Sequence, residues 1–281
     1  MPKVTETPVT DISAPGTGAS AASPSHVSVI DGVLRIAVAT AENGTSLSPA
    51  GVDQGTAALR AAGPEIRAVL LVGEGSNFCA GGNVRGFAGA DDRRAHVGDI
   101  ARRFHEFVLA LDAVGVPIVA AVHGWAAGAG MSIVLHADIA LGGPSTKLRP
   151  AYPSIGYTPD GGMSWTLPRV VGIARAREMI LTDTVLGADE AVRLGVLSRL
   201  VADDEIESEA VRIARTLANG PTAAYAGIRR LVGDSQHRTL AEQLDAELES
   251  ISSAAVSPTG IEGANAFVEK RRPDFTSLER D

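Results

Sequence analysis

Short runs of branched apolar residues recur along the first half of the chain and predict buried strands. They lie at 33–40 (VLRIAVAT), 66–73 (IRAVLLVG), 116–124 (VPIVAAVHG) and 138–143 (DIALGG). Runs of this length and composition are typical of strands that are covered on both faces. VSVI precedes the first run across the turn dipeptide Asp31-Gly32, so we expect a hairpin there.

Segments with helical spacing separate these strands and dominate the last third of the chain. We expect helices at 46–63 with Ser48 as N-cap, at 91–115 with acidic residues at its start, and at 126–137 (AAGAGMSIVLHA). The residues numbered in the 80s and the Pro/Gly-rich segment 147–162 predict loops. Strands that alternate with helices indicate an α/β fold with parallel strands joined by crossovers.

The chain divides by composition into a tail, a core and a helical end. Residues 1–26 are rich in Thr, Ser, Pro, Ala and Gly and predict a disordered tail, and they lack the apolar stretch of a signal peptide. We expect an α/β core over 27–215. We expect a helical section over 216–281 that makes oligomer contacts.

Charge and composition exclude several classes of protein. The net charge is −8 and no stretch is rich in lysine, so we expect no nucleic-acid partner. No window is long and apolar enough to span a bilayer, so we expect no membrane partner. The single cysteine, Cys79, permits no internal disulfide, which is typical of the cytoplasm. The six histidines show no metal-ligand spacing, so we expect no metal.

Two glycine motifs follow predicted strands and expose backbone N–H groups. Gly81 and Gly82 follow the second run, and Gly124, Gly128 and Gly130 stand between a strand and a helix. Free N–H groups at such places attract anionic oxygen, and two that converge make an oxyanion hole. The alternative is structural, since small residues also permit tight packing of a helix on a sheet.

The motif GWAAGAG at 124–130 is also similar to the nucleotide loop of short-chain dehydrogenases. That loop should follow the first strand, yet here it starts at residue 124. None of the three tyrosines has a lysine four residues later, and no ribose-binding acid follows about 20 residues on. These three observations count against a nicotinamide-dependent dehydrogenase, which a nicotinamide-dependent absorbance change would reveal.

Asp160, in PDGG at 159–162, is a candidate for chemistry. As an N-cap it would accept a hydrogen bond from the helix that follows. As a functional residue it would be a general base in a largely apolar pocket.

Five stretches in this order resemble the crotonase (enoyl-CoA hydratase/isomerase) superfamily between about residues 28 and 275. They are NFCAGGNV (77–84), PIVAAVHGWAAGAGMSIVLHADIA (117–140), PSIGYTPDGGMSWTLPRVVG (153–172), ARAREMILTDTVLGADEAVRLGVLSRLV (174–201) and GIEGANAFVEKRRPDF (260–275). The resemblance implies an α/β crotonase-like spiral of ββα units with a helical C-terminal trimerisation section. It also implies a trimer or a dimer of trimers and a role in fatty acid (lipid) metabolism.

The resemblance assigns the thioester site as well. The N–H groups of Gly82 and Ala129 would form the oxyanion hole for an acyl-CoA thioester. The backbone around Leu47, Ala80, Gly81 and Gly82 would contact coenzyme A, which is part of the substrate, and no cofactor would be bound permanently. Phe267 and Lys270 would touch the CoA nucleotide, often from a neighbouring subunit. The alternative for 267–270 is a solvated helix end whose basic residues suit the helix dipole.

The chain departs from the family at the positions of the acid/base residues. Family hydratases carry two glutamates where this chain has Ser132 and Tyr152. Asp160 matches the acid of some family isomerases and the nucleophile of the 4-chlorobenzoyl-CoA dehalogenase branch. His105 matches the water-activating histidine of that branch, although a structural role is the simpler interpretation.

The resemblance therefore predicts an acyl-CoA enzyme that isomerises an enoyl-CoA double bond with Asp160 as proton shuttle. The alternatives are a hydratase with other acid/base residues, a dehalogenase-like hydrolase and a non-catalytic acyl-CoA-binding protein. We expect the region 84–105 and the C-terminal helices to line the acyl pocket, and the segment 86–98 (GFAGADDRRAHVG) to set substrate size. We expect His123 and His136 to be packed or hydrogen-bonded, and Cys79 to take no part in chemistry.

Overall fold

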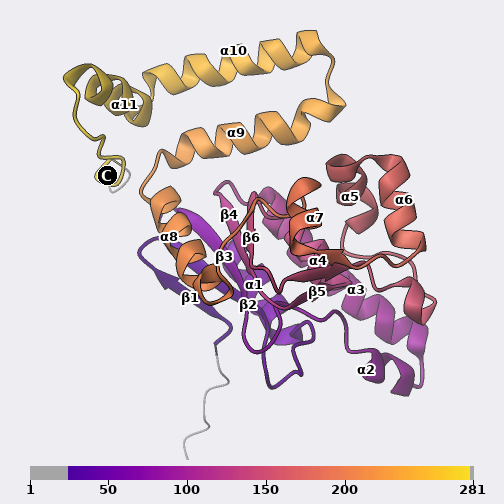
Figure 1. Cartoon of the computed structure of the whole chain (residues 1–281). Coiled ribbons are helices and arrows are strands. Elements are labelled where there is room, and N and C mark those ends of the chain that lie inside the picture. The colour runs from indigo at the N-terminus through magenta and orange to yellow at the C-terminus, as the bar shows by residue number, and fades with distance from the viewer. Residues whose placement is uncertain (1–24, 279–281) are drawn as a thin grey trace, which may run out of the picture.

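The computed structural model describes residues 25–278, whose helices and strands are shown in Figure 1. Of the tail predicted over residues 1–26, residues 1–24 lie outside the described part of the chain. The described chain begins at the edge of a sheet, where the carbonyl of His26 accepts a hydrogen bond of 2.8 Å from the N–H of Ala37.

The predicted apolar strands lie in one six-stranded sheet with the order β1-β2-β3-β4-β6-β9. The pairing of β1 with β2 is antiparallel, which confirms the hairpin at Asp31-Gly32. The remaining neighbours are parallel, which confirms the predicted α/β arrangement. The strands are β1 (Val27–Ile30), β2 (Val33–Ala39), β3 (Ala68–Gly73), β4 (Ile118–Val122), β6 (Ile139–Gly142) and β9 (Arg199–Leu200).

Helices cover both faces of this sheet, so its side chains alternate between two apolar clusters. From β3, Val69 and Leu71 belong to the cluster that includes residues of α1 (Pro49–Arg60) and α3 (Arg93–Ala113). Leu70 belongs to the other cluster, with residues of α8 (Ile206–Ala218). Burying one such side chain contributes about 1.5–3 kcal/mol, so the sheet is a rigid support for the loops at its edge. Ser48 caps α1 as predicted, because its Oγ accepts from the N–H of Gly51 at 3.1 Å.

A second, three-stranded sheet was not predicted. It has the order β5-β7-β8 and consists of β5 (Trp125–Ala127), β7 (Lys147–Arg149) and β8 (Leu186–Gly187). The prediction of a helix over 126–137 is wrong at its start, since α4 spans only Ala129–Val134. Two expected loops also contain structure: α2 (Val84–Gly89) in the 80s, and β7 with the 3₁₀ helix η1 (Pro153–Ile155) within 147–162. Elements this short lack a readable hydrophobic period.

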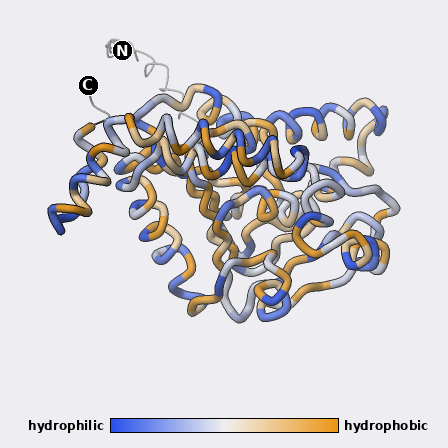
Figure 2. The backbone as a smooth tube through the Cα atoms, turned by 90° about the horizontal axis from the view of Figure 1, so that it is seen from above, coloured by the Kyte–Doolittle hydropathy of each residue, from blue (hydrophilic) through white to orange (hydrophobic). Residues whose placement is uncertain are grey.

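Helices make up most of the remaining chain, as predicted. In Figure 1 the last three project from the core, and hydrophobic residues, orange in Figure 2, recur along them. The predicted division at 215/216 falls inside α8, which packs on the main sheet. The helices after α4 are α5 (Met163–Val171), α6 (Ile173–Leu181), α7 (Ala188–Arg193), α8, α9 (Thr222–Asp234), α10 (Leu240–Val256) and α11 (Pro258–Glu269), with 3₁₀ turns η2 (Asp203–Glu205) and η3 (Ser235–His237).

Candidate active site

The two predicted oxyanion loops lie side by side because the first pairs with β5. The N–H of Cys79 donates to the carbonyl of Trp125 at 3.0 Å, and the N–H of Ala127 donates to the carbonyl of Cys79 at 2.9 Å. These bonds form a parallel bridge between Cys79 and Ala126. The backbone that leads to Gly82 therefore runs along the backbone that leads into α4.

Glycine is required where these loops meet. A Cβ at Gly130 would lie 2.2 Å from the carbonyl oxygen of Cys79, and Gly128 has a φ of +52°. Ala129, the first residue of α4, has no intrahelical partner for its N–H. Within residues 25–278, the N–H groups of Gly82 and Ala129 have no hydrogen-bond acceptor. Ala129 thus presents a free backbone donor at the start of α4.

Asp160 lies against His105, which comes from a distant helix. His105 lies on α3, and its Nε2 contacts Oδ1 of Asp160. Both side chains reach solvent, with 53% of His105 and 32% of Asp160 exposed. The N-cap interpretation of Asp160 is wrong, because Gly162 is the N-cap of α5 and that helix has no side-chain cap. His105 is directed to a carboxylate, whereas its neighbour Phe104 packs in the core.

Ser132 and Tyr152 lie directly behind Asp160 and contact its main chain. Ser132 is fully buried, and its Oγ donates to the carbonyl of Asp160 at 2.8 Å. The hydroxyl of Tyr152 donates to the same carbonyl at 3.2 Å and lies 3.3 Å from Oγ of Ser132. Burial raises the pKa of Tyr152 to about 12. At neutral pH this phenol therefore stays protonated and remains a hydrogen-bond donor.

A salt bridge behind Tyr152 orders the chain that leads to it. A carboxylate oxygen of Asp183 accepts from the N–H of Ala151 at 2.7 Å, and the other contacts Arg149. Ala151 has a φ of +64°, a conformation that costs energy for a residue with a Cβ. Burial opposes ionisation of Asp183, but the bonds from Arg149 and Ala151 outweigh it and lower its pKa. The salt bridge and the hydrogen bond of Asp183 therefore fix the segment that leads to Tyr152.

The structure brings together only part of the predicted CoA-binding set. The N–H of Leu47 donates to the carbonyl of Gly81 at 2.7 Å, and the N–H of Ala80 donates to the main-chain carbonyl of Thr45 at 2.8 Å. Phe267 and Lys270 lie at the end of α11, and 85% of Phe267 is exposed. In Figure 1, α11 lies across the molecule from α2, the helix that follows Gly82. Within one chain, the residues at the end of α11 therefore lie apart from the predicted CoA-contacting backbone at 47 and 80–82.

An aromatic group borders Gly82 and was not singled out from the sequence. The ring of Phe87 lies 2.6 Å from where a Cβ on Gly82 would be. Tyr157 stacks on Phe87 with ring centroids 6.4 Å apart, and His96 meets Phe87 edge-on. Phe87 falls in the segment 86–98 that we expected to set substrate size.

The remaining candidates have structural partners. Burial raises the pKa of the Cys79 thiol to about 12, so it stays protonated at neutral pH. Nε2 of His123 contacts the carbonyl of Gly75 at 3.0 Å, and Nε2 of His136 contacts the carbonyl of Gly161 at 3.2 Å. Among residues 25–278 no three His, Cys, Asp or Glu side chains are placed to hold a metal ion. In the same range no helix is long and apolar enough to cross a membrane.

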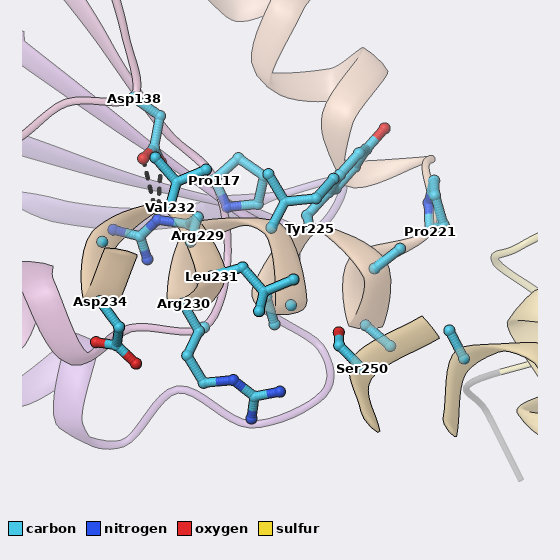
Figure 3. A pocket seen from close by; sticks show the side chains of 18 of the residues that line it. Pro117, Asp138, Pro221, Tyr225, Arg229, Arg230, Leu231, Val232, Asp234 and Ser250 are labelled. Atoms are coloured by element: carbon cyan, nitrogen blue, oxygen red, sulfur yellow. Dashed lines mark hydrogen bonds and ion pairs between the residues drawn. The ribbon is translucent and has the colours of Figure 1, made fainter. Parts of the chain in front are cut away.

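A large cavity lies elsewhere, between the core and the helices α9 and α10. It is open to solvent and has a volume of about 1990 Å³, and none of the six predicted catalytic residues lines it. Figure 3 shows Arg229 of α9 reaching Asp138 of the core. Nε of Arg229 lies 3.0 Å from Oδ2 of Asp138, and Nη2 donates to the carbonyl of Leu111 at 3.2 Å. This ion pair fixes α9 to the core and leaves α10 at a distance from it.

Comparison with known proteins identifies the class to which this fold and site belong. A family model described as enoyl-CoA hydratase/isomerase matches residues 29–278. The chain is 37% identical to "Probable enoyl-CoA hydratase" of Rhodobacter capsulatus, over 79% of this chain and 85% of that one. It is 36% identical to 1,2-epoxyphenylacetyl-CoA isomerase of Escherichia coli, over 75% of this chain and 81% of that one.

A solved structure of the same class has the same fold. The crystal structure of an enoyl-CoA hydratase from Polaromonas sp. JS666 superposes with a TM-score of 0.83 at 31% identity. The superposition covers 88% of this chain and 98% of that one. This chain therefore belongs to the enoyl-CoA hydratase/isomerase family and has the crotonase fold.

Proposed function

We propose that the chain isomerises the double bond of an enoyl-CoA thioester, with Asp160 as proton shuttle. The observation that supports this is the contrast among the three candidate acid/base positions. The carboxylate of Asp160 is partly open to solvent and paired with His105. Ser132 and Tyr152 are buried and engaged with a main-chain carbonyl. Asp160 is thus the available base, because neither hydroxyl ionises readily near neutral pH.

The proposed reaction moves one proton and needs no redox partner. Asp160 removes a proton from the carbon next to the thioester carbonyl of a 3-enoyl-CoA, and the electron pair passes to the carbonyl oxygen. The N–H groups of Gly82 and Ala129 stabilise this dienolate, and one such donor contributes about 3 kcal/mol. Asp160 then returns the proton at the far carbon of the former double bond. His105 orients the carboxylate between the two positions.

A second candidate reaction is favoured by the contact between His105 and Asp160. In this reaction an Asp160 oxygen attacks the ring carbon of a halogenated aroyl-CoA, and halide leaves. Water then hydrolyses the aryl ester of Asp160 while His105 accepts its proton. The stacked rings of Phe87 and Tyr157 beside Gly82 would suit a flat acyl group.

Product analysis with wild-type protein separates these reactions. We expect a 3-enoyl-CoA to be converted to its 2-enoyl isomer at unchanged mass, detected by chromatography and mass spectrometry. Gain of one water by a 2-enoyl-CoA would instead establish a hydratase. Release of chloride from 4-chlorobenzoyl-CoA would establish the dehalogenase. Tight binding of every ester without turnover would indicate a non-catalytic acyl-CoA-binding protein.

We further propose that the functional unit is a homo-oligomer, a trimer or a dimer of trimers. Four apolar side chains of α10 recur at helical spacing, and each is at least 54% exposed: Leu240, Leu244, Leu248 and Ile251. Leu244, Leu248 and Ile251 face the cavity between α10 and the core. A second copy would bury this surface and would bring Phe267 and Lys270 towards the CoA of its neighbour.

Replacing Leu248 with arginine is expected to dissociate the oligomer, because a charge would be buried in an apolar interface. Sedimentation velocity should show the wild type as a trimer or larger and Leu248→Arg as a monomer. Leu181→Arg, at the exposed end of α6, is the matched control and should keep the wild-type mass. A monomeric wild type would contradict the proposal.

A further inference from the structure

Three polar side chains hold the main chain of the turn that carries Asp160. Ser132 and Tyr152 both donate to the carbonyl of Asp160, at 2.8 and 3.2 Å. His136 contacts the next carbonyl, that of Gly161, at 3.2 Å. They come from α4, from the residue before η1 and from the loop after α4. Two consecutive peptide groups are therefore fixed from separate parts of the fold.

The same turn is pressed against the helix that carries His105. Gly161 has a φ of +59°, and a Cβ there would lie 2.2 Å from the ring of Phe104. Gly162 has a φ of +79°, and its Cβ would lie 2.9 Å from Nε2 of His136. No side chain fits at either position. The turn is therefore held between Phe104 on one side and the polar group on the other, which sets where Asp160 meets His105.

The protonation states of the three side chains suit hydrogen-bond donation. Burial raises the pKa of Tyr152 and lowers that of His136, so phenol and imidazole are both neutral near pH 7. Since Nε2 of His136 faces a carbonyl oxygen, its hydrogen must lie on that nitrogen. Asp112 is the charged group that acts on His136. The hydroxyl of Ser132 also lies 3.3 Å from the carbonyl of Gly128, so the single hydrogen of each hydroxyl is engaged with main-chain oxygen.

We infer that Ser132, Tyr152 and His136 are positioning residues, which act by holding the carbonyls of Asp160 and Gly161 so that the carboxylate faces its substrate. This inference rests on the proposed role of Asp160 as proton shuttle and assigns a different role to two residues predicted as catalytic. His136 was expected only to be packed or hydrogen-bonded. Precise placement matters, because an error of 1 Å in a reacting group lowers a rate by about 100-fold.

The test compares variants that remove one hydrogen bond and keep the packing. Tyr152→Phe and Ser132→Ala each lose one hydroxyl, while His136→Leu loses the imidazole donor and His136→Gln keeps an N–H. For a 3-enoyl-CoA we expect each loss to lower kcat on the order of 10- to 100-fold, with KM and the affinity for a CoA ester unchanged. His136→Gln should recover most of the loss in His136→Leu. The double variant Ser132→Ala/Tyr152→Phe should lose less than the product of the single losses, because both hydroxyls hold one carbonyl.

Other outcomes would overturn the inference in distinguishable ways. A loss of kcat above about 1000-fold in Tyr152→Phe, with one limb of the pH–rate profile removed, would make Tyr152 a catalytic acid. Unchanged kcat in Tyr152→Phe, Ser132→Ala and His136→Leu would show that none of them positions Asp160. Asp160→Asn is measured beside them, and if it stays active then the proposed reaction itself fails together with the inference. An inactive Asp160→Asn with unaffected positioning variants would overturn the inference alone.

Discussion

Replacing Asp160 with asparagine is expected to lower kcat for a 3-enoyl-CoA by about 10³-fold, within the range that a positioned acid/base contributes. Asparagine is nearly isosteric and can still contact Nε2 of His105, but it cannot accept a proton near neutral pH. The hydroxyls of Ser132 and Tyr152 contact the main chain of residue 160, so this substitution leaves their bonds in place. The loss of kcat should therefore reflect the missing proton acceptor and not a displaced turn.

Binding and structure should be preserved in this variant. The affinity for a CoA ester, measured by calorimetry, should change little because the predicted CoA-contacting backbone at 47 and 80–82 is untouched. Asp204→Asn is the matched control, since Asp204 is exposed and lies in η2, outside the segment expected to set substrate size. It should have wild-type kcat. Substantial turnover by Asp160→Asn would exclude Asp160 as the proton carrier.

Replacing Gly130 with alanine is expected to cause the second largest loss, about 10²- to 10³-fold in kcat/KM. The new methyl group would lie 2.2 Å from the carbonyl oxygen of Cys79, which is a backbone atom with no freedom to rotate away. The loop that carries Gly82 must therefore move away from α4. This separates the two N–H groups proposed to hold the thioester oxygen, and overpacking of this kind also costs about 1–3 kcal/mol of stability.

Two measurements distinguish misplaced donors from a general loss of structure. A Raman difference spectrum of a bound acyl-CoA should show the thioester carbonyl stretch less shifted in Gly130→Ala than in wild type. Gly187→Ala is the matched control, because Gly187 lies outside the segment expected to set substrate size, has a φ of −75°, and a Cβ there meets nothing within 4 Å. That control should be fully active. A fully active Gly130→Ala would contradict the proposed oxyanion hole.

The main sheet could be predicted from the sequence because β3, β4 and β6 are uninterrupted apolar runs and only Arg35 interrupts the run of β2. Leu70 and Leu71 pack on opposite faces, so both must be apolar, and such a run needs no long-range information to be recognised. The second sheet could not be predicted. Trp125–Ala127 pairs with Lys147–Arg149 across an intervening helix and strand, and three residues have no period of their own.

The sequence by itself determined the α/β fold, the glycines of the two loops and the family, which the comparisons confirm. It also pointed to Asp160 and His105 as candidates. These are properties of local composition and of motifs whose order along the chain is readable.

Only the tertiary structure decided which candidates contact one another. His105 and Asp160 are 55 residues apart, and Ser132 and Asp160 are 28 apart. Their contacts depend on how α3 and α4 pack against the turn before α5. The direction of a side chain in such a turn is set by close packing, here of Phe104 on Gly161 and of His136 on Gly162. Packing between distant segments leaves no local pattern in the sequence. The sequence therefore could not show that Ser132 and Tyr152, which were predicted as catalytic, donate to the carbonyl of Asp160.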